Sequence, residues 1–226
     1  MTLINCKTLE TFIVFKVSCS IFATVMKEKI RDTASQLFLE RGFKSITMDD
    51  IANEIGMSKK TIYSEYSNKT SLVEDCVMNK FCHLSDGIDL IIAMEKNAIE
   101  ELYEIKRYVM SHLNDEKSSP QYQLMKYYPK IHKNLKLMQF DKMHSCVLLN
   151  VERGLEQGLF RDNIDPEFVA RIYFTGMNSI KDQNVFPLDR FPISKLMDSF
   201  LEYHLRGIVT PKGKAILNNI INSNQE

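Results

Sequence analysis

The stretch TMDDIANEIGMSKKTIY, residues 47–63, decides the fold because it places two short helices around a tight turn. Thr47 is a typical N-cap residue in front of a helix with apolar periodicity, and Gly56 stops that helix. Ser58 then caps a second helix over about residues 59–66. Two helices joined by a turn of about three residues that contains glycine form a helix-turn-helix.

The residues before this stretch predict another helix, over about residues 27–41. Its apolar side chains recur at helical spacing, at Ile30, Ala34, Leu37 and Phe38. Gly42 stands where helices commonly end in left-handed backbone, and Phe43 follows where it can contact Phe38. The sequence therefore predicts three helices, followed by a fourth that Asn68 caps.

Lysines stand at two of these helix starts. Lys59 and Lys60 follow Ser58, and Lys69 follows Asn68. A cation at a helix N-terminus opposes the helix dipole, at a cost of about 0.3–1 kcal/mol. A bound phosphate would explain both positions, because helix N-termini with adjacent lysines bind phosphate. The alternative is that these lysines are simply solvated in loops; the helix-turn-helix spacing favours phosphate contact.

Three segments together resemble the DNA-binding domain of TetR-type transcriptional regulators over about residues 27–75. They are T-x-x-x-I-A at 47–52, I-G-x-S-x-x-T-I-Y at 55–63 and x-K-x-x-L at 68–72. The resemblance implies that phosphates are held by Thr47, Thr61, Tyr63 and Lys69. It also implies that base edges are faced by Lys59, Lys60 and Ser64. Lys60 is the first candidate for a base reader, because lysine suits guanine O6 and N7.

The chain departs from the family pattern at two positions. Lys60 stands where the family often has Gly or Pro, so the operator sequence does not follow by analogy. Tyr66 stands where Phe is usual, which keeps the apolar ring and adds a hydroxyl that needs a partner. Glu65 has two interpretations, as an acceptor from cytosine N4 or as a solvated acid.

Residues 1–25 do not fit the rest of the chain. Their apolar part, residues 12–25, is interrupted by Lys16 and is shorter than the roughly 20 residues that span a bilayer. A signal peptide is one alternative and a real extra segment is another. We expect Met26 to be the start, because an amphipathic helix begins there at once, and we expect no membrane partner.

The remaining chain predicts further helices without a convincing strand, so the expected fold class is all-α. Candidate helices span about 69–95, 98–113, 121–137, 140–157, 166–182, 193–208 and 211–222. Pro129 should kink or divide its helix, and Asp165 with Pro166 should start another. We assign 26–72 to the helix-turn-helix DNA-binding domain and 73–226 to a helical effector-binding and dimerisation domain.

The second domain resembles the same family more loosely, in KYYP at 126–129, ERGLEQGLFR at 152–161 and RGIVT at 206–210. The resemblance implies a homodimer through 166–182 and 193–208, and an unknown small-molecule effector between the helices. Candidates for the dimer interface are Phe168, Ile172, Tyr173, Leu196, Phe200, Leu201 and Leu205. Candidates for the effector pocket are Met78, Phe81, Tyr103, Met125, Tyr128 and Met143. Both sets suit plain core packing equally well.

Composition and missing motifs argue against other classes of protein. The chain has 29 basic and 29 acidic residues, so any contact with nucleic acid must come from local clustering. Five cysteines without C-x-x-C argue against a disulfide framework or a zinc site and favour a reducing cytoplasm. The sequence lacks P-loop, G-x-G-x-x-G, G-x-S-x-G and H-E-x-x-H motifs. We therefore expect no enzyme, no cofactor and no metal.

The sequence thus predicts a cytoplasmic, homodimeric repressor that binds double-stranded DNA at a pseudo-palindromic operator and is released by a small molecule. The alternative is a TetR-like DNA-binding adaptor that has no effector and acts through a protein partner. An open apolar cavity in the second domain would favour the first hypothesis, and a closed, filled interior would favour the second.

Overall fold

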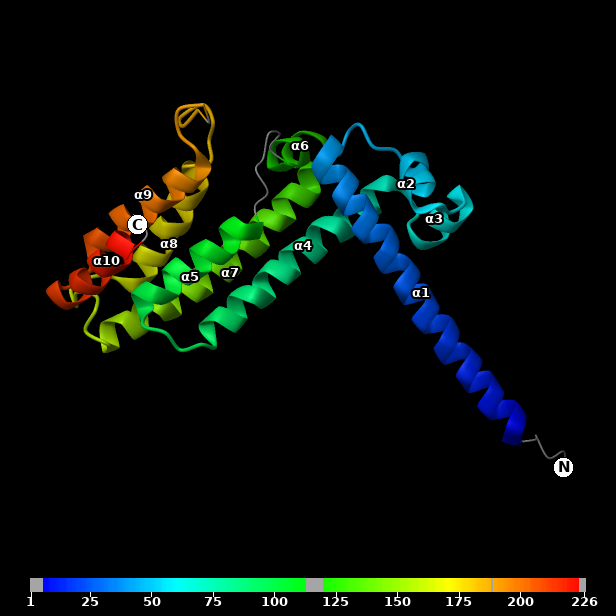
Figure 1. The fold of residues 1–226 in the computed structure, drawn as a ribbon, viewed down its shortest axis with the longest axis horizontal. Coiled ribbons are helices and arrows are strands. Elements are labelled where there is room, and N and C mark those ends of the chain that lie inside the picture. Colours follow the sequence, from blue (N-terminus) through cyan, green and yellow to red (C-terminus); the bar gives the residue numbers. More distant parts are fainter. Residues whose placement is uncertain (1–5, 113–119, 188, 224–226) are drawn as a thin grey trace. The chain divides into compact units, whose positions relative to one another are not determined.

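The computed structural model describes residues 6–112, 120–187 and 189–223, which form ten helices (Figure 1). They are α1 Cys6–Arg41, α2 Met48–Ile55, α3 Lys59–Glu65, α4 Lys69–Ile92, α5 Ala98–His112, α6 Pro120–Tyr127, α7 Pro129–Glu156, α8 Pro166–Ser179, α9 Ile193–Ile208 and α10 Pro211–Ser223. β pairing within the described residues is limited to one isolated bridge between Phe160 and Val209. The all-α prediction is confirmed.

The chain divides into two compact units. The first comprises the described residues of 1–80 and 117–133, and the second those of 81–116 and 134–226. The predicted boundary at 72–73 lies inside α4, which contributes residues to both units. The division into 26–72 and 73–226 stays a prediction.

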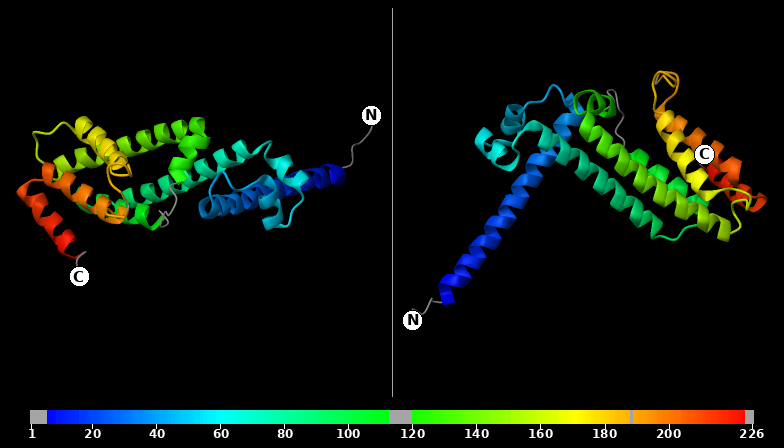
Figure 2. Two further views of the ribbon diagram at one scale, coloured as in Figure 1. Left: turned by 90° about the horizontal axis from the view of Figure 1, so that it is seen from above. Right: turned by 180° about the vertical axis from the view of Figure 1, so that it is seen from behind.

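The first unit contains the helix-turn-helix. α2 packs on α1 and α3 packs on α2, while the N-terminal half of α1 extends beyond both (Figure 2). Each of the helices α1 to α4 contributes at least one fully buried side chain to the core of this unit. They are Ile30 and Ala34 from α1, Ile51 from α2, Ile62 from α3 and Leu72 from α4. This core fixes the face of α3 that points inward, and therefore the face that points to solvent.

Two helix boundaries differ from the sequence prediction. α1 ends at Arg41 as expected but begins at Cys6 rather than near residue 27. Neither glycine nor proline occurs between residues 6 and 26, so nothing in that segment interrupts a helix. The predicted break at 137–140 is wrong, because α7 continues through these residues without a breaker. Pro129 divides α6 from α7, which is one of the two predicted outcomes.

The second unit has a core built from α5, α7, α8, α9 and α10. Its buried side chains include Ile99, Val151, Leu201, Leu205 and Leu217. Asp165 caps α8 as predicted, since its carboxylate accepts from the N–H groups of Glu167 and Phe168 at 3.0 and 3.3 Å. The second unit is thus a closely packed helical body.

None of the helices in the described part of the chain combines the length and apolarity that crossing a membrane requires.

Candidate nucleic-acid interface

The start of α2 is held by a reciprocal pair of contacts between Thr47 and Asp50. Thr47 Oγ1 accepts from the Asp50 N–H at 3.1 Å, and the Thr47 N–H donates to Asp50 Oδ2 at 2.8 Å. The Thr47 hydroxyl also donates to Asp50 Oδ2 at 2.7 Å, and these hydrogen bonds lower the pKa of the Asp50 carboxyl. The predicted cap is confirmed as a capping box. Asp50 was missed as its partner, although an acidic residue three positions after the cap signals one.

The turn and the start of α3 follow the sequence prediction. Gly56 adopts left-handed backbone with φ 73°, a conformation that disfavours side chains. Ser58 Oγ then accepts from the Thr61 N–H at 3.1 Å and lies 2.8 Å from Thr61 Oγ1. The recognition helix α3 therefore begins at a fixed place, with the lysines in its first turn.

The residues proposed to read bases lie in three different environments. Lys59 Nζ lies 2.8 and 2.9 Å from the two carboxylate oxygens of Asp49 and 6.0 Å from the centre of the Tyr63 ring. The hydrogen bond from Lys59 to Asp49 raises the pKa of the ammonium group. Lys60 is exposed and makes no side-chain hydrogen bond or ion pair within the described residues. The Ser64 hydroxyl donates to the Thr61 carbonyl at 2.7 Å.

The start of α4 carries the lysine expected to hold a phosphate. Asn68 caps the helix as predicted, because its Oδ1 accepts from the Ser71 N–H at 2.9 Å. Lys69 Nζ lies 3.5 Å from the Lys44 carbonyl and 5.9 Å from the centre of the Phe38 ring. Burial lowers the pKa of the Lys69 ammonium. Lys69 is therefore held partly against the protein rather than extended into solvent.

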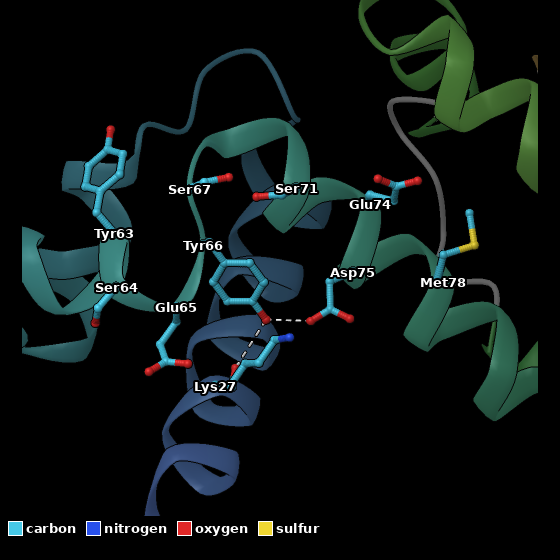
Figure 3. A pocket seen from close by; sticks show the side chains of 10 residues that line it. All are labelled: Lys27, Tyr63, Ser64, Glu65, Tyr66, Ser67, Ser71, Glu74, Asp75 and Met78. Atoms are coloured by element: carbon cyan, nitrogen blue, oxygen red, sulfur yellow. Dashed lines mark hydrogen bonds between the residues drawn. The ribbon is translucent and has the colours of Figure 1, made fainter. Parts of the chain in front are cut away.

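The end of the recognition helix is anchored through Tyr66, as Figure 3 shows. This side chain is 3% exposed, and its hydroxyl donates to Asp75 on α4 at 2.5 Å and to the Lys27 carbonyl on α1 at 3.5 Å. Burial, followed by the Asp75 carboxylate, raises the pKa of the phenol. The sequence predicted that this hydroxyl needs a partner, and Asp75 is the partner it could not name.

A hollow lies beside this anchor, lined by residues of α1, α3 and α4 and by Tyr66 (Figure 3). Of the six predicted pocket residues, it contains Met78 alone. Met125 and Tyr128 also belong to the first unit, whereas Phe81, Tyr103 and Met143 belong to the second. No hollow within one unit therefore contains all six, and the effector pocket stays a prediction.

The predicted dimer residues fall into two groups by exposure. Phe168 and Ile172 on α8 are exposed, at 63% and 45%. Within the single chain, the buried members Tyr173, Leu196, Leu201 and Leu205 belong to the core of the second unit. The half-buried Phe200 packs against Tyr173 at 5.7 Å between ring centres. Tyr203 on α9, which the predicted set does not include, is also exposed.

Three further observations concern chemistry outside the helix-turn-helix. Glu101 is 2% exposed, pairs with Arg153 at 2.5 Å and accepts from Asn150 at 2.8 Å, so α5 is tied to α7 by a buried polar cluster. The described residues contain no group of three or more His, Cys, Asp or Glu side chains placed to hold a metal. Burial raises the pKa of the Cys76 thiol to about 11, which disfavours the reactive thiolate.

Comparisons with known proteins bear on the helix-turn-helix and on the fold. Residues 30–76 match the sequence model of the family described as "Bacterial regulatory proteins, tetR family". The chain is 27% identical over 186 residues to the uncharacterized HTH-type transcriptional regulator YvaF of Bacillus subtilis, covering 81% of this chain and 95% of that one. It is 36% identical over 83 residues to the biofilm operon negative regulator IcaR of Staphylococcus aureus, which is 35% of this chain and 42% of IcaR.

The fold is also similar to a solved regulator. The structure of SmeT, the repressor of the Stenotrophomonas maltophilia multidrug efflux pump SmeDEF, matches with a TM-score of 0.65 at 16% identity, over 82% of this chain and 91% of that one. SmeT in complex with triclosan matches with a TM-score of 0.63 at 14% identity, over 83% and 93%. At this identity the likeness concerns the fold.

Proposed function

We propose that this chain, whose residues 30–76 match the tetR family of bacterial regulatory proteins, is a transcriptional regulator that acts as a homodimeric repressor of a pseudo-palindromic operator. The relatives are regulators rather than enzymes, and this chain is not an enzyme. The observation that carries the proposal is the capped helix-turn-helix, which presents Lys59 and Lys60 in the first turn of α3 and Lys69 in the first turn of α4. We assign its site of action to the cytoplasm, where the DNA of a bacterial cell lies.

In this proposal α3 enters the major groove. Lys59, Lys60 and Ser64 face base edges, and of these Lys60 has an ammonium group free of protein partners in the described chain. The phosphate contacts are Thr47, Thr61, Tyr63 and Lys69. Because one α3 reads only a few base pairs, two copies related by a two-fold axis are needed for a site about one helical turn long.

DNA binding in a salt series tests these roles. The full chain is measured by fluorescence anisotropy against tiled fragments of the DNA upstream of its own gene. Lys60→Ala should weaken binding to the preferred fragment and relax its base preference, whereas Lys69→Ala should weaken all fragments alike and reduce the salt slope by about one unit. Exposed Lys214 on α10 provides the matched control, Lys214→Ala, which removes the same charge far along the chain. Weak binding that does not distinguish fragments would overturn the operator proposal.

The proposed dimer face is the exposed part of α8 and α9, with Phe168, Ile172 and Tyr203. Exposed apolar side chains of this kind gain stability when a second copy covers them. Phe168→Glu should therefore shift the chain toward monomer in analytical ultracentrifugation. Leu149→Glu is the matched control, because Leu149 on α7 is also 63% exposed. An equal effect of both substitutions would count against this face.

The proposed switch is a small apolar effector bound in residues 73–226, where a ligand acts through its differential affinity for the two DNA-binding states. The SmeT complex with triclosan supports this class of ligand. Triclosan is therefore the first probe, and it should release the preferred fragment in the anisotropy assay. The adaptor without an effector is supported by the packed core of the second unit, where Ile99, Leu201 and Leu205 are at most 1% exposed.

A further inference from the structure

The two lysines at the start of the recognition helix, Lys59 and Lys60, differ in the contacts that their ammonium groups make with the rest of the protein. Lys59 Nζ contacts both carboxylate oxygens of Asp49, at 2.8 and 2.9 Å, and lies over the Tyr63 ring at 6.0 Å. Lys60 is exposed and has no hydrogen bond or ion pair with the described chain. The Lys59 ammonium group is therefore restrained from two sides, by Asp49 of α2 and by Tyr63 of α3, whereas nothing in the described chain restrains the Lys60 ammonium group.

Asp49 is an unusual residue for a surface that meets DNA. Its place in the first turn of α2 suits the helix dipole, but a carboxylate near phosphates is repelled by them. An ammonium group has three N–H donors, and the carboxylate of Asp49 leaves at least one of them for another acceptor. To reach a phosphate elsewhere, Lys59 must leave Asp49, whereas a base edge facing the free donor can be reached with the pair intact.

We propose that Asp49 is a specificity-determining residue of the DNA-binding surface: it withholds Lys59 from phosphates and directs its remaining N–H donor to a guanine acceptor in the major groove. The inference rests on the proposed function, since it needs α3 in the groove. It assigns unlike roles to two neighbouring lysines. Lys59 contacts its base while Asp49 restrains its ammonium group, and Lys60 contacts its base without such a restraint.

The exposure of the pair sets the size of the expected effect. The side chains of Lys59 and Asp49 are 58% and 55% exposed, so water screens their attraction. Exposed pairs of this kind change an equilibrium by about two- to five-fold. Asp49→Asn should therefore raise affinity for DNA of arbitrary sequence by about that factor and lower the ratio of specific to non-specific binding accordingly.

The experiment selects binding sites from a library of random 30-base-pair duplexes, using the full chain, its Asp49→Asn variant and its Glu54→Gln variant. Glu54 is an exposed acid on the same helix and makes no ion pair with Lys59 in the described chain, so Glu54→Gln removes the same charge and leaves the Lys59 contacts in place. Each protein is then titrated, in a salt series, with the selected duplex and with a shuffled duplex of the same composition.

The expected result separates the two substitutions. Asp49→Asn should bind the shuffled duplex about two- to five-fold more tightly, steepen its salt dependence by about one unit and lose preference at one G·C pair in each half-site. Glu54→Gln should leave the specificity ratio unchanged. Lys59→Ala should lose the same preference, and adding Asp49→Asn to it should have no further effect on the ratio.

The outcomes distinguish this inference from the proposed function. If the unsubstituted chain enriches no sequence, both fail. If it enriches a site and Asp49→Asn keeps the same specificity ratio as Glu54→Gln, the operator proposal stands and the role of Asp49 is refuted. Asparagine keeps the size of the side chain, and thermal unfolding of both variants checks that the domain remains folded.

Discussion

The hydroxyl of Tyr66 ties the end of the recognition helix to α4, and its removal by Tyr66→Phe should destabilise the first unit. The ring is 3% exposed, so phenylalanine fills the same space. The lost contact is the 2.5 Å hydrogen bond to Asp75, and the weaker 3.5 Å contact to the Lys27 carbonyl is lost with it. A hydrogen bond to a charged acceptor contributes about 1.5–3 kcal/mol. Because Asp75 is only partly buried and water can reach it, we expect the lower end, about 1.5 kcal/mol.

Urea unfolding at pH 7 measures this loss, and the alkaline limb of stability gives a second readout. The pKa of Tyr66 lies above its unfolded value of 10.0, so the unfolded chain releases this proton first as the pH rises. The stabilisation by Tyr66 is therefore complete below pH 10 and declines above it. The unsubstituted chain should lose stability more steeply above pH 10 than Tyr66→Phe does.

The control is Tyr63→Phe, because Tyr63 is exposed and its hydroxyl makes no hydrogen bond to the described residues. It should change stability by less than about 0.5 kcal/mol. The reasoning is refuted if the two variants unfold at the same urea concentration and share one alkaline limb. Water would then satisfy the Tyr66 hydroxyl and Asp75 as well as they satisfy each other.

Four further substitutions have expected effects on urea midpoints. Burial lowers the pKa of His204 from 6.5 to about 4, so the unfolded chain binds this proton first as the pH falls. The folded state should therefore lose about 2 kcal/mol of stability between pH 7 and pH 5. His204→Leu should abolish this loss. Gly154→Ala should cost about 1–3 kcal/mol, because its methyl group would lie 2.1 Å from a buried phenylalanine ring, while Gly207→Ala, with nothing within 4 Å, should gain about 0.5 kcal/mol. Arg153→Met should cost about 3 kcal/mol or more, because it leaves the buried carboxylate of Glu101 unpaired.

Features set by neighbouring residues could be predicted from the sequence. The caps by Thr47, Ser58 and Asn68 and the turn at Gly56 depend on the backbone within a few residues, and all four are confirmed. The predicted end of a helix at 137–140 is wrong because it rested on the apolar pattern alone, with no glycine or proline in these residues. Helix caps and turns can thus be predicted from a few neighbouring residues. A change in the apolar pattern alone does not predict the end of a helix.

Contacts between helices could not be predicted in the same way. Asp49 and Lys59 are ten residues apart, and Glu101 and Arg153 are fifty-two apart, so their pairing depends on how one helix is rotated against another. The sequence showed that Tyr66 needs a partner because a buried hydroxyl must be satisfied. It gave no means to choose among the polar side chains that the fold brings near it.

These contacts change the electrostatic argument for DNA binding. A bound phosphate is one explanation for the three lysines at helix starts, but two of them already contact other groups of the protein. Asp49 pairs with Lys59, and Lys69 is held partly against the protein, where burial lowers the pKa of its ammonium group. Lys60 alone of the three is exposed and has no ion pair in the described chain. Lys60→Ala should therefore change the salt dependence of DNA binding more than Lys59→Ala does, because Asp49 already pairs with Lys59.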